Sequence, residues 1–146
     1  MEYSTKQQIE MFVKEWGTDF HSLLLTSTML KKSIIDVNKE LSNLWKTQNF
    51  IDIKMLDRAD KQKLNAIISS KKGVRETKVS VYRPKGAKPG KRGDPRFWPY
   101  GLNKVAEKGD KLIIFVVNST SIIIVVDPEK MEDPKAIIQK INAVLY

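Results

Sequence analysis

Apolar residues in the first half of the chain recur at the spacing of an α-helix. Over residues 5–25 they lie three and four positions apart and form one stripe, and the same spacing returns over residues 28–45. Residues 57–70 have the length and composition of a third helix, which the stop signal Lys71-Lys72-Gly73 would end. The short apolar run 50–56 fits neither a helix nor a strand clearly and is left open. The pattern therefore predicts a helical N-terminal half.

The second half of the chain shows patterns typical of strands. Thr77–Arg83 alternates valines with polar residues, which predicts a half-buried strand. Lys111–Val117 and Ser121–Asp127 are β-branched runs joined by a short polar turn, so we expect a hairpin. Because both runs are apolar almost throughout, we expect helices to cover the hairpin on both faces.

Two further helices complete the predicted architecture. Tyr100–Lys108 is a candidate short helix closed by Gly109, and Asp133-Pro134 is a typical start for a final helix. The expected fold class is α+β, with a helical N-terminal half (about residues 1–72) followed by a small antiparallel β-sheet with a C-terminal helix (about residues 73–146). A length of 146 residues suits a single domain that spans residues 1–146.

The composition removes several kinds of chemistry. The chain has no cysteine, which excludes disulfides, thiolate metal sites and cysteine nucleophiles. His21 is the single histidine, and its position beside an apolar stripe favours a structural role. The N-terminal residues lack the pattern of a signal peptide, and no apolar run has the length of a membrane span. We therefore expect a cytoplasmic protein with no membrane partner.

The net charge of +9 is concentrated in one segment of the chain. Residues 71–108 contain twelve lysines and arginines and only three acidic residues, which accounts for the whole excess. Clustered positive charge is typical of a protein that binds a polyanion, because each neutralised phosphate releases counterions. A solvated basic loop without a partner is the plainer alternative, and the clustering favours the polyanion.

The stretch 82–102 combines basic residues, glycines and prolines with the aromatic residues Phe97, Trp98 and Tyr100. Arginines can grip phosphates or a guanine edge, glycines allow close backbone approach, and aromatic rings stack on unpaired bases. Core packing is the alternative role for the aromatic residues, above all for Trp98. The candidate nucleic-acid-binding residues are Arg83, Lys85, Lys88, Lys91, Arg92, Arg96, Trp98 and Tyr100.

One part of this stretch resembles a known group of proteins. The segment Arg92-Gly-Asp-Pro-Arg-Phe-Trp-Pro-Tyr-Gly-Leu102, with the Gly109-Asp110 turn and the apolar hairpin that follow, resembles modules of bacterial restriction endonucleases and associated phage-defence proteins. The resemblance covers about a third of the chain. It implies a module that reads DNA or accompanies a nuclease, and it implies no catalytic residue. The matching positions are Arg92, Asp94, Arg96 and Trp98.

A Mg²⁺-dependent endonuclease is the main alternative function. Such an enzyme needs clustered carboxylates to hold the metal and a lysine near the attacking water. Asp36 followed by Asp52-Ile53-Lys54 supplies an acid and an acid-x-Lys triplet, although Asp36 lies in a segment with helical periodicity. Mg²⁺ is expected only under this alternative, and no cofactor is expected otherwise. Glu107, Asp110 and Asp127 are further acids near the basic loop, without the spacing of metal ligands.

Two other functions stay open. A small metal-free ribonuclease could use Tyr82, Arg83, Arg96 and Tyr100 for acid–base and phosphate chemistry. A basic protein-interaction module would dock on an acidic partner or within a larger defence complex. The leading prediction is a nucleic-acid-binding domain, with DNA favoured, that uses the basic and aromatic loop and is not itself an enzyme.

Overall fold

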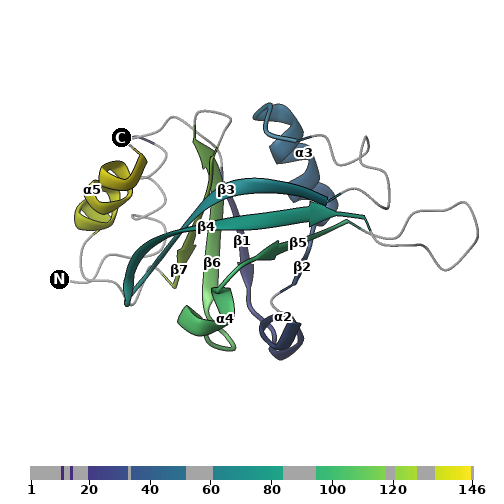
Figure 1. Ribbon diagram of the computed structural model, residues 1–146, viewed down its shortest axis with the longest axis horizontal. Helices are drawn as coiled ribbons and strands as arrows, with labels where there is room; N and C mark the ends of the chain where they lie inside the picture. Colours follow the sequence, from purple (N-terminus) through teal and green to yellow (C-terminus); the bar gives the residue numbers. More distant parts are fainter. Residues whose placement is uncertain are drawn as a thin grey trace, which may run out of the picture.

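The computed structural model describes residues 11, 14, 20–32, 34–51, 61–83, 95–117, 121–127 and 134–145. Seven strands form one curled sheet with the order β1-β6-β7-β3-β4-β5-β2, and the β3–β4 hairpin runs along the molecule from the side of α5 to the side of α3 (Figure 1). The strands are β1 (Phe20–Leu24), β2 (Ile35–Asp36), β3 (Lys61–Ser70), β4 (Gly73–Tyr82), β5 (Arg96–Pro99), β6 (Lys111–Val117) and β7 (Ser121–Val126). The helices are α2 (Ser27–Lys32), α3 (Lys39–Thr47), α4 (Leu102–Val105) and α5 (Pro134–Leu145).

The predicted fold class is wrong, because the described residues form mostly β-sheet in a curled half-barrel, and the described part of the N-terminal half contains strands with short, scattered helices. Of the predicted helix over residues 57–70, the described part is instead β3, which pairs antiparallel with β4 and parallel with β7, and residues 57–60 lie outside the described residues. Leu64 and Ile68 lie four positions apart, as on a helix, but Leu64, Ala66 and Ile68 also lie at every second position, as on one face of a strand. Backbone hydrogen bonds to β4 on one side and to β7 on the other make this segment a strand, because strand pairing outweighs the local helical preference.

The two other predicted N-terminal helices are correct only in part over the residues that the structure describes. Met11 and Lys14 are helical, and α2 and α3 account for most of the second predicted helix. Phe20–Leu24, placed in the first predicted helix, pairs with β6 as an edge strand. The second predicted helix is divided into α2 and α3 by Ile35–Asp36, which pairs with β5. Ile35 and Val37 are buried in the core, and Asn38 then caps α3 by accepting a hydrogen bond from Leu41 N at 2.9 Å. The burial of Ile35 and Val37 explains why the predicted helix is divided, since burying these two side chains in the core contributes more free energy than continuing the helix.

Several expectations for the C-terminal half are confirmed. β6 and β7 form the predicted antiparallel hairpin, and α5 follows it. The predicted strand at Thr77–Arg83 exists as part of the longer β4. The predicted helix at Tyr100–Lys108 is reduced to the single turn α4. The sheet itself is larger than predicted, and the β3–β7 pair makes it mixed rather than antiparallel.

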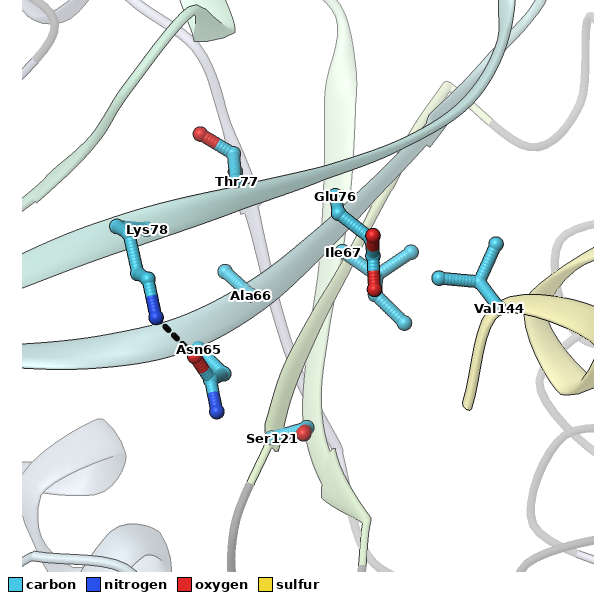
Figure 2. A pocket seen from close by; sticks show the side chains of 8 residues that line it. All are labelled: Asn65, Ala66, Ile67, Glu76, Thr77, Lys78, Ser121 and Val144. Atoms are coloured by element: carbon cyan, nitrogen blue, oxygen red, sulfur yellow. Dashed lines mark hydrogen bonds between the residues drawn. The ribbon is translucent and has the colours of Figure 1, made fainter. Parts of the chain in front are cut away.

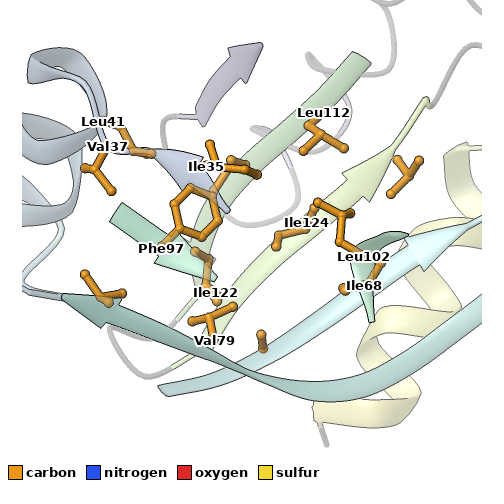
Figure 3. Packing of buried hydrophobic residues seen from close by; sticks show 14 of the residues in the cluster. Ile35, Val37, Leu41, Ile68, Val79, Phe97, Leu102, Leu112, Ile122 and Ile124 are labelled. Atoms are coloured by element: carbon orange, nitrogen blue, oxygen red, sulfur yellow. The ribbon is translucent and has the colours of Figure 1, made fainter. Parts of the chain in front are cut away.

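The hairpin is covered on both faces, as its apolar pattern predicts. The inner face of the curled sheet packs against α3, where Leu41 is fully buried in one cluster with Phe97 of β5 (Figure 3). Trp45 of α3 is fully buried in the same cluster. The outer face packs against Ile138 and Ile141 of α5. This second cluster draws its buried sheet residues from β3, β6 and β7, and Val74 near the start of β4 packs against it. Among the described residues, the outer face from Lys78 onward in β4 and the outer face of β5 and β2 do not belong to it.

Within the part of the chain that the structure describes, no helix has the length and apolar character needed to cross a membrane.

Candidate nucleic-acid interface

The alternation of side chains along β3, β4 and β5 gathers one polar and aromatic surface on the outer face of the sheet. Ser80 pairs with both Trp98 and Lys63, so the three side chains share a face. The same face carries the Tyr82–Arg96 pair and the Lys78–Asn65 pair. We call this surface the outer patch, and it comprises Lys63, Asn65, Lys78, Ser80, Tyr82, Arg96, Trp98 and Tyr100.

Trp98 is the exposed aromatic residue of the outer patch. Its exposed fraction is 38%, whereas the preceding Phe97 is fully buried against Trp45, with ring centroids 5.4 Å apart. Alternation on β5 therefore assigns Phe97 to the core and Trp98 to the surface. The core-packing alternative for Trp98 is excluded by this placement.

Tyr100 fixes Trp98 in place from the side. The two rings meet edge to face, with centroids 5.1 Å apart and planes at 80°. The Tyr100 hydroxyl is 2.6 Å from the hydroxyl of Ser80, and the Tyr100 carbonyl accepts a hydrogen bond from the hydroxyl of Thr77 at 2.9 Å. The Tyr100 N–H donates to the Lys78 carbonyl at 3.1 Å. These contacts hold the aromatic pair on rigid sheet rather than on a loop.

Cationic side chains surround the aromatic pair. Lys63 and Lys78 are exposed on the outer patch, and the Lys78 ammonium donates a hydrogen bond to Asn65 Oδ1. Arg96 lies at the patch edge with 43% of its side chain exposed. Arg83 is partly exposed just after the end of β4. The patch therefore combines cations with an accessible ring.

Four of the predicted binding residues lie outside the described residues: Lys85, Lys88, Lys91 and Arg92. Asp94, a matching position of the resemblance, lies outside them too. The strands on either side of residues 84–94 are neighbours, because Tyr82 pairs with Arg96. The ends of β4 and β5 that flank residues 84–94, the basic segment, therefore lie side by side at the edge of the outer patch.

The structure brings together only part of the predicted nuclease set. Asp36 lies on the edge strand β2, not on a helix, and its carboxylate is 3.8 Å from Arg96 Nε. Asp52 and Lys54 lie outside the described residues. Among the residues that the structure describes, no three histidine, cysteine, aspartate or glutamate side chains gather as a metal site would require.

Asp110 and Asp127, two other acids named in the sequence analysis, lie in the connections between elements. Asp110 is buried, and its Oδ2 accepts a hydrogen bond from Glu107 N at 2.8 Å. The Asp110 carbonyl accepts from Leu25 N at 2.9 Å, which ties this turn to the end of β1. Asp127 has a positive φ of 46° directly after β7. These positions explain Asp110 and Asp127 as structural residues.

His21 faces the core from β1, with 10% of its side chain exposed and its Nδ1 4.0 Å from Glu40 of α3. Burial lowers the pKa of His21, and the nearby Glu40 carboxylate opposes that change in part. The neutral imidazole is therefore favoured, which fits the structural role that the sequence indicates.

The predicted nucleic-acid-binding set lacks five residues of the outer patch: Lys63, Asn65, Lys78, Ser80 and Tyr82, of which Tyr82 is named only under the ribonuclease alternative. The helical spacing of Leu64 and Ile68 concealed Lys63 and Asn65. The alternation over residues 77–83 does predict a strand with Lys78, Ser80 and Tyr82 on one face, but it does not show that β3 and β5 lie beside that face.

Compared with protein-family models, with curated proteins and with solved structures, the chain matches none of them. The resemblance of Arg92–Leu102 to restriction and phage-defence modules therefore stays a prediction.

Proposed function

We propose that this protein binds nucleic acid, with DNA favoured, through the outer patch and the basic segment that joins β4 to β5. The observation that carries the proposal is the exposed Trp98, held by Tyr100 on rigid sheet and bordered by Lys63, Lys78 and Arg96. Aromatic rings beside a cationic groove bind nucleic acid by stacking on bases while the cations neutralise phosphates.

The charge distribution supports the same proposal. The whole net charge of +9 falls in residues 71–108, which contain β4, the basic segment and β5. Tyr82 and Arg96, which flank the basic segment in the sequence, both belong to the outer patch, so the cations of the patch and of the segment can act on one ligand. Phosphate contacts would supply most of the affinity and make it depend steeply on salt.

The resemblance of Arg92–Leu102 favours DNA over RNA and adds a context to the proposal. In that context the protein acts in the cytoplasm in bacterial restriction or phage defence, and a partner in a larger complex supplies any catalysis.

The deciding experiment measures fluorescence anisotropy of labelled single- and double-stranded DNA with the wild-type protein and with Trp98→Ala. We expect salt-dependent binding by the wild type and about tenfold weaker binding by the variant, because stacking on one base contributes about 1–3 kcal/mol. Leu24→Ala is the matched control, since Leu24 is 64% exposed on β1 and four strands separate β1 from β5. Equal affinity for Trp98→Ala and wild type would overturn the role of the patch.

The same samples, incubated with Mg²⁺ and run on a gel, report whether the DNA stays intact. Intact DNA is expected, because the proposed function is binding alone.

A further inference from the structure

Four cations of the charged segment 71–108 lie away from the outer patch, where the β3–β4 turn meets α4 (Figure 1). We call this surface the basic turn, and it comprises Lys71, Lys72, Arg75 and Lys104. All four residues are exposed. Among the residues that the structure describes, none of the four forms an ion pair with an acid. Their charge is therefore accessible to an anionic partner.

Two contacts hold the basic turn in one arrangement. The Lys72 ammonium donates a hydrogen bond to the Lys104 carbonyl at 3.0 Å, which ties the β3–β4 turn to α4. The Arg75 guanidinium lies against Gly101, with Nη1 3.2 Å from the position that a Cβ atom of residue 101 would take. Gly101 has a φ of 86°, so this residue supplies both the backbone conformation and the space for the guanidinium. The cations therefore lie on one junction rather than on independent loops.

The edge of β4 connects the outer patch with the basic turn. β5 pairs with residues 79–82 of β4, and Tyr100 and Gly101 then follow the same edge of β4 toward its start. The Thr77 hydroxyl donates to the Tyr100 carbonyl at 2.9 Å, and Arg75 meets Gly101 two residues earlier on β4. The chain that carries the aromatic pair thus leads directly to the basic turn.

The outer face of β4 does not continue the positive charge in this direction. Glu76 follows Lys78 on this face and lines one cavity with Val144 of α5, whereas Thr77 points away from the Lys78–Asn65 pair (Figure 2). A polyanion that extends from the outer patch toward the β3–β4 turn would meet an acid and a helix on the outer face. Along the edge of β4 it would meet cations.

We propose that the basic turn is a second phosphate contact for the same DNA strand that the outer patch binds, and that this strand follows the edge of β4 between them. The proposal rests on the proposed function. Lys72 precedes Ser80, the partner of Trp98, by eight positions, which is about 26 Å along an extended strand. At about 3.4 Å per phosphate of a DNA strand, this distance corresponds to about eight nucleotides.

The basic turn supplies charge without a ring for stacking. In the described part of the chain, the exposed large hydrophobic side chains are Leu24 and Trp98, and neither belongs to the basic turn. Lysines and arginines contact phosphates whatever the base. Lys72 retains two ammonium N–H groups beyond the one that bonds to Lys104. We therefore expect the basic turn to add affinity and salt dependence without a sequence preference.

The experiment measures how salt changes the binding of labelled deoxythymidine strands of 20 and of 3 nucleotides by the wild type and by Lys71→Ala/Lys104→Ala. Neither of these two side chains makes a hydrogen bond within the described residues, so the variant keeps the bond from Lys72 to the Lys104 carbonyl. On the 20-mer the slope of log affinity against log salt should fall by about 1.4, because each single-strand phosphate contact contributes about 0.7. The 3-mer spans only about 10 Å, so wild type and variant should show equal slopes.

Lys39→Ala/Lys46→Ala is the matched control, because it removes two exposed lysines from α3, which lies well apart from the β3–β4 turn and α4 (Figure 1). Its slope on the 20-mer should fall by less than half as much. Equal slopes for the wild type and Lys71→Ala/Lys104→Ala, or an equal fall in variant and control, overturns the basic turn as a phosphate contact while the proposed function stands. An equal fall on the 3-mer and the 20-mer overturns the path along β4.

A labelled glutamate 20-mer tests for an acidic protein as the partner of the basic turn. Loss of this peptide's binding in Lys71→Ala/Lys104→Ala, with DNA binding unchanged, would assign the surface to such a protein and overturn the proposal. If the wild type binds neither DNA strand at low salt, the proposed function fails and the second phosphate contact fails with it.

Discussion

Asp36 on β2 and Arg96 on β5 are paired across two neighbouring strands, and their side chains form an ion pair with 3.8 Å between Oδ1 and Nε. The sequence predicts Asp36 as a metal ligand of a nuclease and Arg96 as a contact to nucleic acid. The structure couples these two residues to each other. An acid beside an arginine of the outer patch competes with phosphate for that arginine.

Asp36→Asn should therefore strengthen nucleic-acid binding. Both side chains are largely exposed, so the ion pair contributes only about 0–1 kcal/mol and the gain in affinity should be at most about fivefold. Anisotropy titrations at low salt measure it. A variant that binds normally but loses Mg²⁺-dependent cleavage of DNA would support the nuclease alternative instead.

Lys63→Ala should weaken binding by a salt-dependent amount. If Lys63 neutralises one phosphate, its loss lowers the slope of log affinity against log salt by about 1. The measurement is a salt titration of wild type, Lys63→Ala and Lys39→Ala. Lys39 is also an exposed lysine, but it lies on α3, which packs on the inner face, so its removal should change the slope less. Equal slopes for all three proteins would remove Lys63 from the interface.

Trp45 and Trp98 should differ in what their truncation to alanine changes, with Trp45 affecting stability and Trp98 affecting binding. Trp45 is fully buried between Phe50 and Phe97, so Trp45→Ala should lower the free energy of unfolding by about 3–5 kcal/mol. Trp98→Ala should change that free energy much less, because the ring is partly exposed, and should act on binding. Urea unfolding followed by circular dichroism separates the effects. A large stability loss from Trp98→Ala would mean that the ring serves the fold.

Stability should fall on mild acidification because of His21. Burial lowers its pKa in the folded protein below the ordinary value of 6.5, so just below pH 6.5 the unfolded chain binds more protons than the folded one. The free energy of unfolding is therefore highest above this pH and decreases as pH falls from about 6.5 toward the folded-state pKa. Unfolding curves at pH 7.5 and pH 5.5 measure the loss.

Two variants test the origin of this pH dependence. His21→Gln should flatten the dependence between pH 7.5 and pH 5.5. Glu40→Gln should steepen it, because the carboxylate is the group that raises the His21 pKa against burial. A pH dependence that is unchanged in His21→Gln would assign it to other groups.

The sequence by itself determined those elements whose apolar pattern has one period. The runs Lys111–Val117 and Ser121–Val126 are continuous and β-branched, and they form a hairpin with both faces covered, as predicted. The helix from Pro134 also follows its own stripe and start signal. The concentration of positive charge in residues 71–108 needs no structure either.

Only the tertiary structure decided the rest of the fold and the site. Lys61–Ser70 carries both a helical and a strand period, and the choice depended on β4 and β7, which lie later in the chain. The outer patch exists because the register sets Trp98 beside Ser80 and Lys78 beside Asn65. Local patterns report which face of an element is apolar, but they do not report which partner strand it meets. Pairing between distant segments therefore decides which side chains share a surface.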